Sequence, residues 1–260
     1  VTLKAYSDEL RKRGHFGLKS EQRTREWQRV MAKVHLRHQR WQEALGLLEP
    51  YLAWSETFRD SLSLEERLPY FRGTSQGAYQ DAILAHAALY NQTPSERAFD
   101  TALVALGKLK ARHLKDALEA SGKTGGLSAA SAADKVNALV RRGSTYFSVA
   151  DAGDTLITYL ADANGKTIRL ARKSAGFDSN VLALRNSLAE RRLFDTRTAR
   201  NISALVLGNL EPRVFGQRPL VAEIDGPLSF LPVELWLDEK MTPLGAQSAV
   251  SYLPTLAMAD

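Results

Sequence analysis

The 260-residue sequence contains no cysteine. Disulfide bonds, thiolate metal sites and nucleophilic attack by a thiolate of this chain are therefore excluded. Because a chain without cysteine suits reducing and oxidising compartments alike, this absence does not fix a redox environment. The first residue is Val1 rather than methionine, so we expect a processed product or a fragment of a longer chain.

Long hydrophobic runs are also missing. The apolar runs extend over only a few residues, as in residues 202–207, whereas a membrane-spanning helix needs about 18 or more. The first residues lack the basic segment followed by an apolar one that is typical of a secretory signal. With 44% hydrophobic residues the chain can still bury a core. We expect a cytoplasmic protein with no membrane partner.

Histidine is confined to the first half of the chain, at His15, His35, His38, His86 and His113. His35 and His38 can share one face of a predicted helix, but the neighbouring basic residues indicate a solvated surface. The triplet Gly122-Lys123-Thr124 lacks the upstream glycine of a phosphate-binding loop, and a predicted helix rather than a strand precedes it. We therefore expect no metal and no cofactor.

The net charge is +6, from 35 Lys and Arg against 29 Asp and Glu. A pI near 9.5 is compatible with nucleic-acid or acidic partners. The basic residues are spread out, however, and the nearby Trp27 and Trp41 are explained by packing between helices. A basic adaptor in a nucleic-acid-associated effector complex is one alternative for the function.

The first half has the apolar periodicity of paired helices. One predicted helix covers residues 24–38, and a break at Gln39-Arg40 precedes a second apolar stripe over residues 41–54. Pro50 is expected to kink this helix or end it early. A further pair is predicted over residues 68–90 and 94–120, with Thr93 as the N-cap of the second helix.

The segment Arg40-Trp41-Gln42-Glu43-Ala44-Leu45-Gly46-Leu47-Leu48 resembles the second helix of a tetratricopeptide repeat. The resemblance implies a small residue where paired helices approach, and Ala32 and Ala44 meet this requirement, as do Ala98, Ala102 and Ala105. The separation between Ala44 and Ala98 exceeds the usual 34-residue period, so the repeats are degenerate or interrupted. The alternative is an amphipathic bundle without repeat ancestry.

The second half changes to strand-forming composition. Residues 122–131 have the composition of a linker, and a helix near residues 132–142 precedes three segments rich in β-branched and aromatic residues. Asn164-Gly165 predicts a hairpin in which both residues have positive φ. Two helices, a strand over residues 219–225 and a short strand over residues 248–252 follow. We predict helical repeats over residues 1–121, then an α/β unit over 132–260 that begins with an antiparallel hairpin sheet.

Four segments resemble bacterial proteins in which tetratricopeptide repeats lead into a CHAT domain, a caspase-like cysteine peptidase related to separase. They cover residues 98–114, 146–170, 219–236 and 249–256. The third has the family's order of a strand, Asp225-Gly226, then Leu231-Pro232 and Glu234, and the fourth contains Val250-Ser251-Tyr252. The resemblance implies the first part of a caspase-like α/β sandwich.

The family's catalytic His and Cys lie on later strands, where the thiolate attacks the scissile carbonyl and the imidazole acts as base. This chain has no Cys and no His after His113, so we expect no catalytic residue in it. By resemblance it is the N-terminal regulatory and structural portion of such a peptidase. A non-catalytic scaffold of repeats is the other alternative.

Asp225 and Gly226 follow a predicted buried strand, at the end where open α/β sheets bind ligands. We expect them to border a substrate cleft, although Asp before Gly also favours an ordinary turn. Half a sheet would leave an unpaired edge beside residues 221–224. We therefore expect a second polypeptide, or a C-terminal half, that completes the sheet, and a protein or peptide partner on the helical array.

Overall fold

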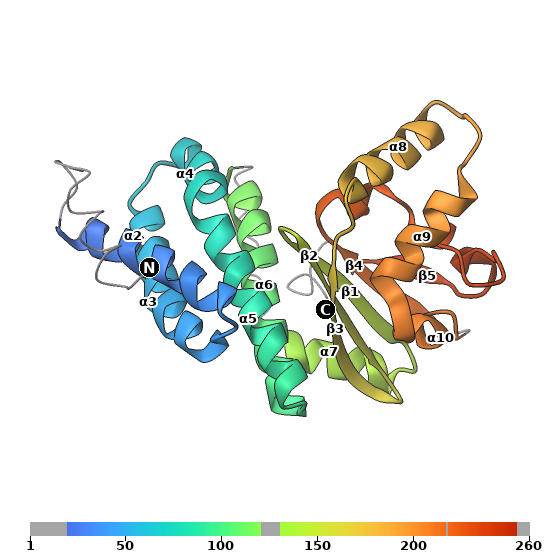
Figure 1. The fold of residues 1–260 in the computed structure, drawn as a ribbon, viewed down its shortest axis with the longest axis horizontal. Helices are drawn as coiled ribbons and strands as arrows, with labels where there is room; N and C mark the ends of the chain where they lie inside the picture. The colour runs from blue at the N-terminus through green and yellow to red at the C-terminus, as the bar shows by residue number, and fades with distance from the viewer. Residues whose placement is uncertain (1–19, 121–130, 217, 254–260) are drawn as a thin grey trace.

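The computed structural model describes residues 20–120, 131–216 and 218–253, and it places a helical region before a five-stranded mixed sheet. Figure 1 shows helices α2 to α6 on one side of the sheet and α8 to α10 on the other. Within the described ranges, no helix is both long and apolar enough to cross a membrane.

From Ser20 onward, the described helical region contains the α-helices α2 (Ser20–Arg37), α3 (Trp41–Asp60), α4 (Leu64–Tyr70), α5 (Gln76–Gln92) and α6 (Glu96–Ala120). Small residues line the contact of α2, α3 and α5, where Ala32, Ala78 and Ala85 are fully buried beside Leu48 and Tyr51. The break predicted at residues 39–40 is a turn in which Gln39 has a φ of +56°. The apolar stripes therefore identified the first two helices correctly.

Pro50 does not end its helix, because α3 continues to Asp60. Proline removes a backbone donor and crowds the carbonyl group four residues earlier. Pro50 and Gly46 both lie on the exposed side of α3, and a Cβ at Gly46 would have no neighbour within 4 Å. Water can therefore reach the Gly46 carbonyl, and the expected early end of the helix was wrong.

The predicted helix over residues 68–90 is interrupted. It begins earlier, as α4, and a π-helical turn over Phe71–Ser75 separates α4 from α5. The cap of α6 also differs from the prediction, because the Ser95 hydroxyl, not Thr93, accepts the Ala98 N–H at 3.1 Å. Helix α6 thus begins where the Ser95 hydroxyl can form a capping hydrogen bond. The π-helical turn begins at Phe71, whose side chain is buried.

Strands β1 (Thr145–Ala152), β2 (Thr155–Asp162) and β3 (Gly165–Arg172) form the predicted antiparallel hairpin sheet. Strands β4 (Leu220–Ile224) and β5 (Val250–Tyr252) extend it with parallel pairing, in the order β3-β2-β1-β4-β5. The expected unpaired edge beside residues 221–224 was therefore wrong. Strand β4 lies between β1 and β5, and among the described residues β5 forms this edge of the sheet.

The β2–β3 hairpin turns one residue earlier than predicted. Asp162 pairs with Gly165, so that Ala163 and Asn164 occupy the turn. Gly165 has a φ of +120°, whereas Asn164 is not among the described residues with positive φ. Instead, the Asp162 carboxylate accepts the Asn164 N–H at 2.7 Å, which stabilises a turn without left-handed backbone at Asn164.

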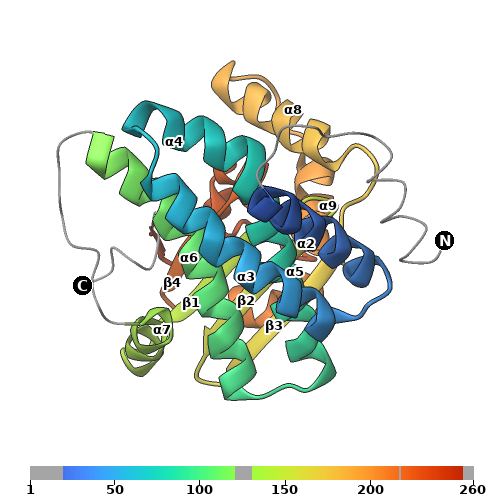
Figure 2. The ribbon, with the colours of Figure 1, turned by 90° about the vertical axis from the view of Figure 1, so that its left-hand side faces the viewer.

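Helices cover both faces of the sheet, as Figures 1 and 2 show. On one face, α5, α6 and α7 (Ala132–Arg141) share a core with the inward side chains of β1, β2 and β3. On the other face, α8 (Phe177–Ala189), α9 (Thr196–Leu207) and α10 (Glu211–Val214) pack on Phe147, Leu156 and Leu160. The predicted division at residues 122–131, nearly all outside the described residues, stays a prediction.

Phe99 joins the helical region to the sheet. It is fully buried, and its ring contacts Tyr90 and Tyr159 with centroid separations of 6.0 and 6.1 Å. We expect Phe99→Ala to lower the free energy of unfolding by about 3–5 kcal/mol, because it leaves a cavity under α6. Val104→Ala, at a position on the same helix that is 38% exposed, is the matched control and should cost less than about 1 kcal/mol. Urea unfolding measures both, and equal losses would contradict this packing.

Candidate functional site

The loop predicted to border a cleft lies at the carboxyl ends of β1 and β4. The Asp225 N–H donates to the Val149 carbonyl at 3.0 Å, which extends the parallel ladder one step beyond β4. The Asp225 carboxylate accepts the Gly226 N–H at 2.8 Å, at the start of a 3-10 turn over Gly226–Phe230. Asp225 and Gly226 are thus at the predicted edge of the sheet, and the Asp225 side chain stabilises the turn.

Gly226 lies against the side chain of Asp151. Its φ is +66°, and a Cβ added there would lie 2.8 Å from both Cβ and Oδ2 of Asp151. Only glycine satisfies the backbone conformation and this close approach together. The loop after β4 is therefore held directly against the end of β1.

Asp151 forms an ion pair that sequence reasoning missed. The Lys173 Nζ lies 2.7 Å from Asp151 Oδ2 and 3.0 Å from Asp178 Oδ1, and the Lys173 side chain is only 10% exposed. Burial raises the pKa of Asp151, and the Lys173 ammonium opposes this shift. Burial lowers the pKa of Lys173, but hydrogen bonds to the two carboxylates outweigh it and raise that pKa above its ordinary value. Lys173 is therefore held as a cation beside the candidate loop.

The helical region also contacts Asp151. The Gln80 side chain on α5 donates to the Asp151 carbonyl at 2.9 Å. Asp151 thus contacts Lys173 after β3, the glycine after β4 and a helix that precedes the sheet in sequence. No local pattern in the sequence indicates this meeting point, because its members come from segments far apart in the chain.

The two most specific blocks of the CHAT resemblance are in contact. The Tyr252 hydroxyl on β5 accepts the Val233 N–H at 2.7 Å and donates to the Glu234 carboxylate. Burial and then the Glu234 hydrogen bond raise the pKa of Tyr252. Glu234 also packs on Gly245, where an added Cβ would lie 2.9 Å from the Glu234 Cβ. These contacts fix β5 to the segment that follows the Asp225 loop.

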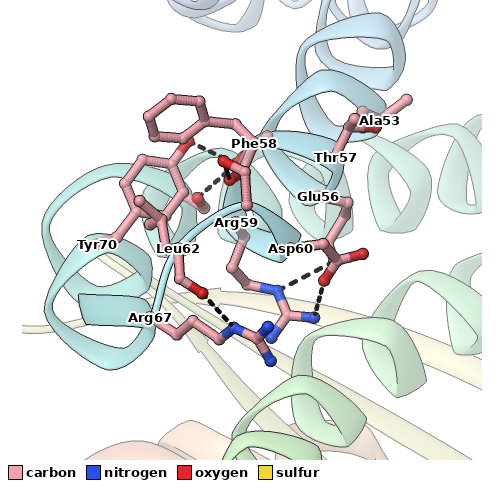
Figure 3. A network of polar contacts seen from close by, with 12 residues as sticks. Ala53, Glu56, Thr57, Phe58, Arg59, Asp60, Leu62, Arg67 and Tyr70 are labelled. Carbon is pink, nitrogen blue, oxygen red and sulfur yellow. Dashed lines mark hydrogen bonds and ion pairs between the residues drawn. The ribbon is translucent and has the colours of Figure 1, made fainter. Parts of the chain in front are cut away.

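A separate polar network lies at the C-terminal end of α3 (Figure 3). The hydroxyl oxygens of Ser55 and Ser75 are 2.6 Å apart, and the Tyr70 hydroxyl oxygen lies 3.2 Å from that of Ser55. Arg59, only 1% exposed, pairs with Asp60 at 2.7 Å. The network joins α3 to α4 and to the π-helical turn. We assign it to the stability of this helix corner, because its hydroxyls and charges are directed at one another.

The groups at this edge of the sheet hold one another in position through an ion pair and hydrogen bonds. They comprise carboxylates, one lysine, an amide and a phenol, and the sequence has no cysteine to supply a thiolate nucleophile. The histidines all precede the sheet in sequence, and the most C-terminal of them is His113. The side chains that meet at this edge therefore hold the start of the Asp225 loop in place and put a buried ion pair beside it.

The contact between Gly226 and Asp151 predicts an effect of substitution. Gly226→Ala introduces both a positive φ at a non-glycine residue and a clash with Asp151. Gly153→Ala is the matched control, since Gly153 has a φ of +76° with no atom within 4 Å of an added Cβ. We expect each change to incur about 1 kcal/mol for its backbone conformation, and Gly226→Ala to lose at least about 1 kcal/mol more. Thermal unfolding measures the difference, and equal losses would show that the close approach is absent.

Comparison with models of protein families finds no match to this chain, and comparison with curated protein sequences finds none either. The CHAT resemblance therefore depends on the four sequence segments quoted above alone.

Proposed function

We propose that this chain is the N-terminal regulatory and structural portion of a CHAT-type caspase-like cysteine peptidase. It supplies the helices for partner recognition, the first strands of the sheet and one border of the substrate cleft. The Cys nucleophile and the His base come from a segment or polypeptide that pairs with it. The observation that carries the proposal is the edge of β5, on which no strand lies in the described residues. It is next to parallel strands whose carboxyl ends hold Asp225 and Gly226.

The outer edge of β5 has the backbone groups needed to bind another strand. Ala249 O accepts the Leu220 N–H, and the Leu253 N–H donates to Ala222 O, so these groups face β4. Because backbone groups of successive residues alternate in a parallel ladder, the N–H and C=O groups of Val250 and Tyr252 face the other side. In the described part of the chain, no strand lies on that side.

The surroundings of β5 also favour an added strand. Parallel strands are usually covered on both faces, whereas Ser251 and Tyr252 are exposed, Tyr252 by 49%. Val250 and Leu253 already pack at the margins of the two cores that cover the opposite faces of the sheet. A strand added beside β5 would therefore continue both cores.

The Asp225–Phe230 loop is the expected border of the cleft, because added parallel strands would end at the same edge of the sheet. Phe230 at the end of the loop is 57% exposed, and the Arg185 guanidinium lies 4.8 Å from its ring centroid. An exposed aromatic ring and a cation are suitable for binding an extended peptide. The Asp151 side chain, which is paired with Lys173, packs against Gly226 in this loop.

The first test identifies the polypeptide that binds the edge. A photo-cross-linking amino acid at Ser251, which is exposed on β5, is expressed in the native host, and the captured polypeptide is identified by mass spectrometry. We expect a polypeptide, or a continuation of this chain, with a His and a Cys that each follow a predicted strand. Capture of a polypeptide without Cys would contradict the peptidase role and favour the scaffold alternative.

The second test uses Val250→Pro. Proline is tolerated in an edge strand where the N–H faces outward, so β4–β5 pairing should survive while strand addition is blocked. We expect association with the captured polypeptide to weaken at least about tenfold and peptidase activity of the mixture to fall in parallel. Val250→Ala is the control, because it shortens the same side chain but keeps the N–H, and it should retain association. Equal effects of both variants would contradict strand addition, as would peptidase activity from this chain alone.

A further inference from the structure

The exposed side of α8 carries an arginine that is stacked on an aromatic ring. The Arg185 guanidinium lies 4.8 Å from the centroid of the Phe230 ring, and both side chains are exposed, Phe230 by 57%. Arg185 forms no ion pair or hydrogen bond with another described residue. A guanidinium that stacks on a ring keeps its N–H edge available for a bidentate contact with a carboxylate.

The carboxylates nearest to Arg185 in sequence are already paired with other cations. Asp178 on α8 lies 3.0 Å from the Lys173 ammonium, and Glu190, just after α8, lies 2.7 Å from the Arg192 guanidinium. Within the described part of the chain, Arg185 is thus an exposed cation that no carboxylate neutralises. A carboxylate on another molecule can therefore pair with it without displacing a partner.

Apolar surface adjoins this stacked pair. Leu182, one helical turn before Arg185, is 48% exposed. Leu184 and Leu231, which are the sequence neighbours of Arg185 and Phe230, line a hollow between α8, α9 and the segment after the Asp225 loop. The other side chains that line it are also hydrophobic: Phe194, Ala199, Ile202, Pro232, Leu235 and Trp236.

The hollow is too small for a free small-molecule ligand. It contains about 220 Å³ of empty space, its open mouth included, whereas pockets for such ligands usually have about 300–1,000 Å³. Pro232 is exposed, and Phe194 and Leu235 are half-buried, so the hollow opens to the surface. It therefore suits an apolar side chain that belongs to a larger partner.

We propose that Leu182, Arg185 and Phe230, together with the adjoining hollow, form a docking surface for an acidic, apolar segment of a partner polypeptide. The segment presents a carboxylate to Arg185 and an apolar side chain to the hollow. Helix α8 lies on the side of the sheet opposite to α2 to α6 (Figure 1), so this surface is separate from the partner surface expected on the helical array. The inference rests on the proposed function only for the role of the Asp225–Phe230 loop as a cleft border.

The surroundings favour a polypeptide over a nucleic acid. An aromatic ring beside a cation can also bind a base, but a nucleic-acid groove adds cations that follow the phosphates. Here Lys173 and Arg192 are paired with carboxylates, and the adjoining hollow is lined by hydrophobic side chains. An unpaired guanidinium beside an apolar hollow matches one carboxylate and one apolar side chain.

The test selects ligands from a displayed library of random peptides of about 12 residues, with the 260-residue chain as bait. We expect the enriched peptides to combine Asp or Glu with Leu, Ile or Phe. The most enriched peptide is then synthesised with a fluorescein label, and its affinity is measured by fluorescence anisotropy. Arg185→Gln and Phe230→Ala should each weaken its binding at least about tenfold.

Arg172→Gln is the matched control, because Arg172 is an arginine on β3 whose side chain is 84% exposed. It should change the affinity less than about twofold. Arg185 and Phe230 are exposed, so the variants should keep the fold, which circular dichroism checks. If Phe230→Ala does not fold, the comparison of Arg185→Gln with Arg172→Gln decides.

The docking surface would be overturned by a selection that enriches no peptide, or only peptides without acidic residues. Equal effects of Arg185→Gln and Arg172→Gln would also overturn it. A labelled single-stranded oligonucleotide that binds and is weakened by Arg185→Gln and Phe230→Ala, when the peptide is not, would assign the surface to nucleic acid and contradict the proposal. No catalytic segment is present in these measurements, so their failure is distinguishable from failure of strand addition at β5.

Discussion

Residues 146–150 of β1 are buried, with side chains alternating between the two faces of the sheet, so helices must cover this strand from two sides. Tyr146 and Ala150 pack toward α5, α6 and α7, whereas Phe147 and Val149 pack toward α8 and α9. The helical region is for this reason not an appendage: α5 and α6 form one layer of a three-layer arrangement. A displacement of either helix would therefore disturb the buried side chains that it shares with the sheet.

The polar groups divide the layers into parts with different roles. Lys110 and Glu223 join α6 to β4, and Asp151, paired with Lys173, packs at the end of β1 against the Asp225 loop. Both pairs are largely removed from water, where loss of one partner is costly and geometry is tightly specified. Toward β5 the polar contacts are made at the surface, by Tyr252 and Glu234, and no strand among the described residues pairs with the backbone edge beyond them. The buried ion pairs thus lie near the middle of the described sheet, and the polar contacts of β5 lie at its surface.

Much of the fold could be predicted from local patterns. The apolar stripes identified α2 and α3, and Asn164-Gly165 located a hairpin, because these features depend on residues close in sequence. The strands over residues 219–225 and 248–252 were both predicted, but their pairing as β4 and β5 was not, because it joins segments far apart in the sequence. Likewise, Pro50 is tolerated only because its side of α3 is exposed, which periodicity did not indicate.

The candidate site was predicted only in part. Asp225 and Gly226 could be placed at the end of a strand, but the Asp151–Lys173 pair could not, because the two residues are 22 positions apart and meet only after β1, β2 and β3 have assembled. The same holds for Lys110 and Glu223, which no spacing rule connects. Sequence reasoning located the loop and missed the groups that hold it, since those groups are brought together by tertiary structure.

The most direct measurement is residue-resolved amide exchange along β5, recorded by NMR before and after addition of the polypeptide that the cross-linking experiment identifies. An open edge predicts that Ser251, whose N–H faces β4, is protected in both states. Val250 and Tyr252 should exchange rapidly in the isolated chain and become protected in the complex. Protection of Val250 and Tyr252 in the isolated chain, or their continued rapid exchange in the complex, would contradict a sheet that is completed by an added strand at β5.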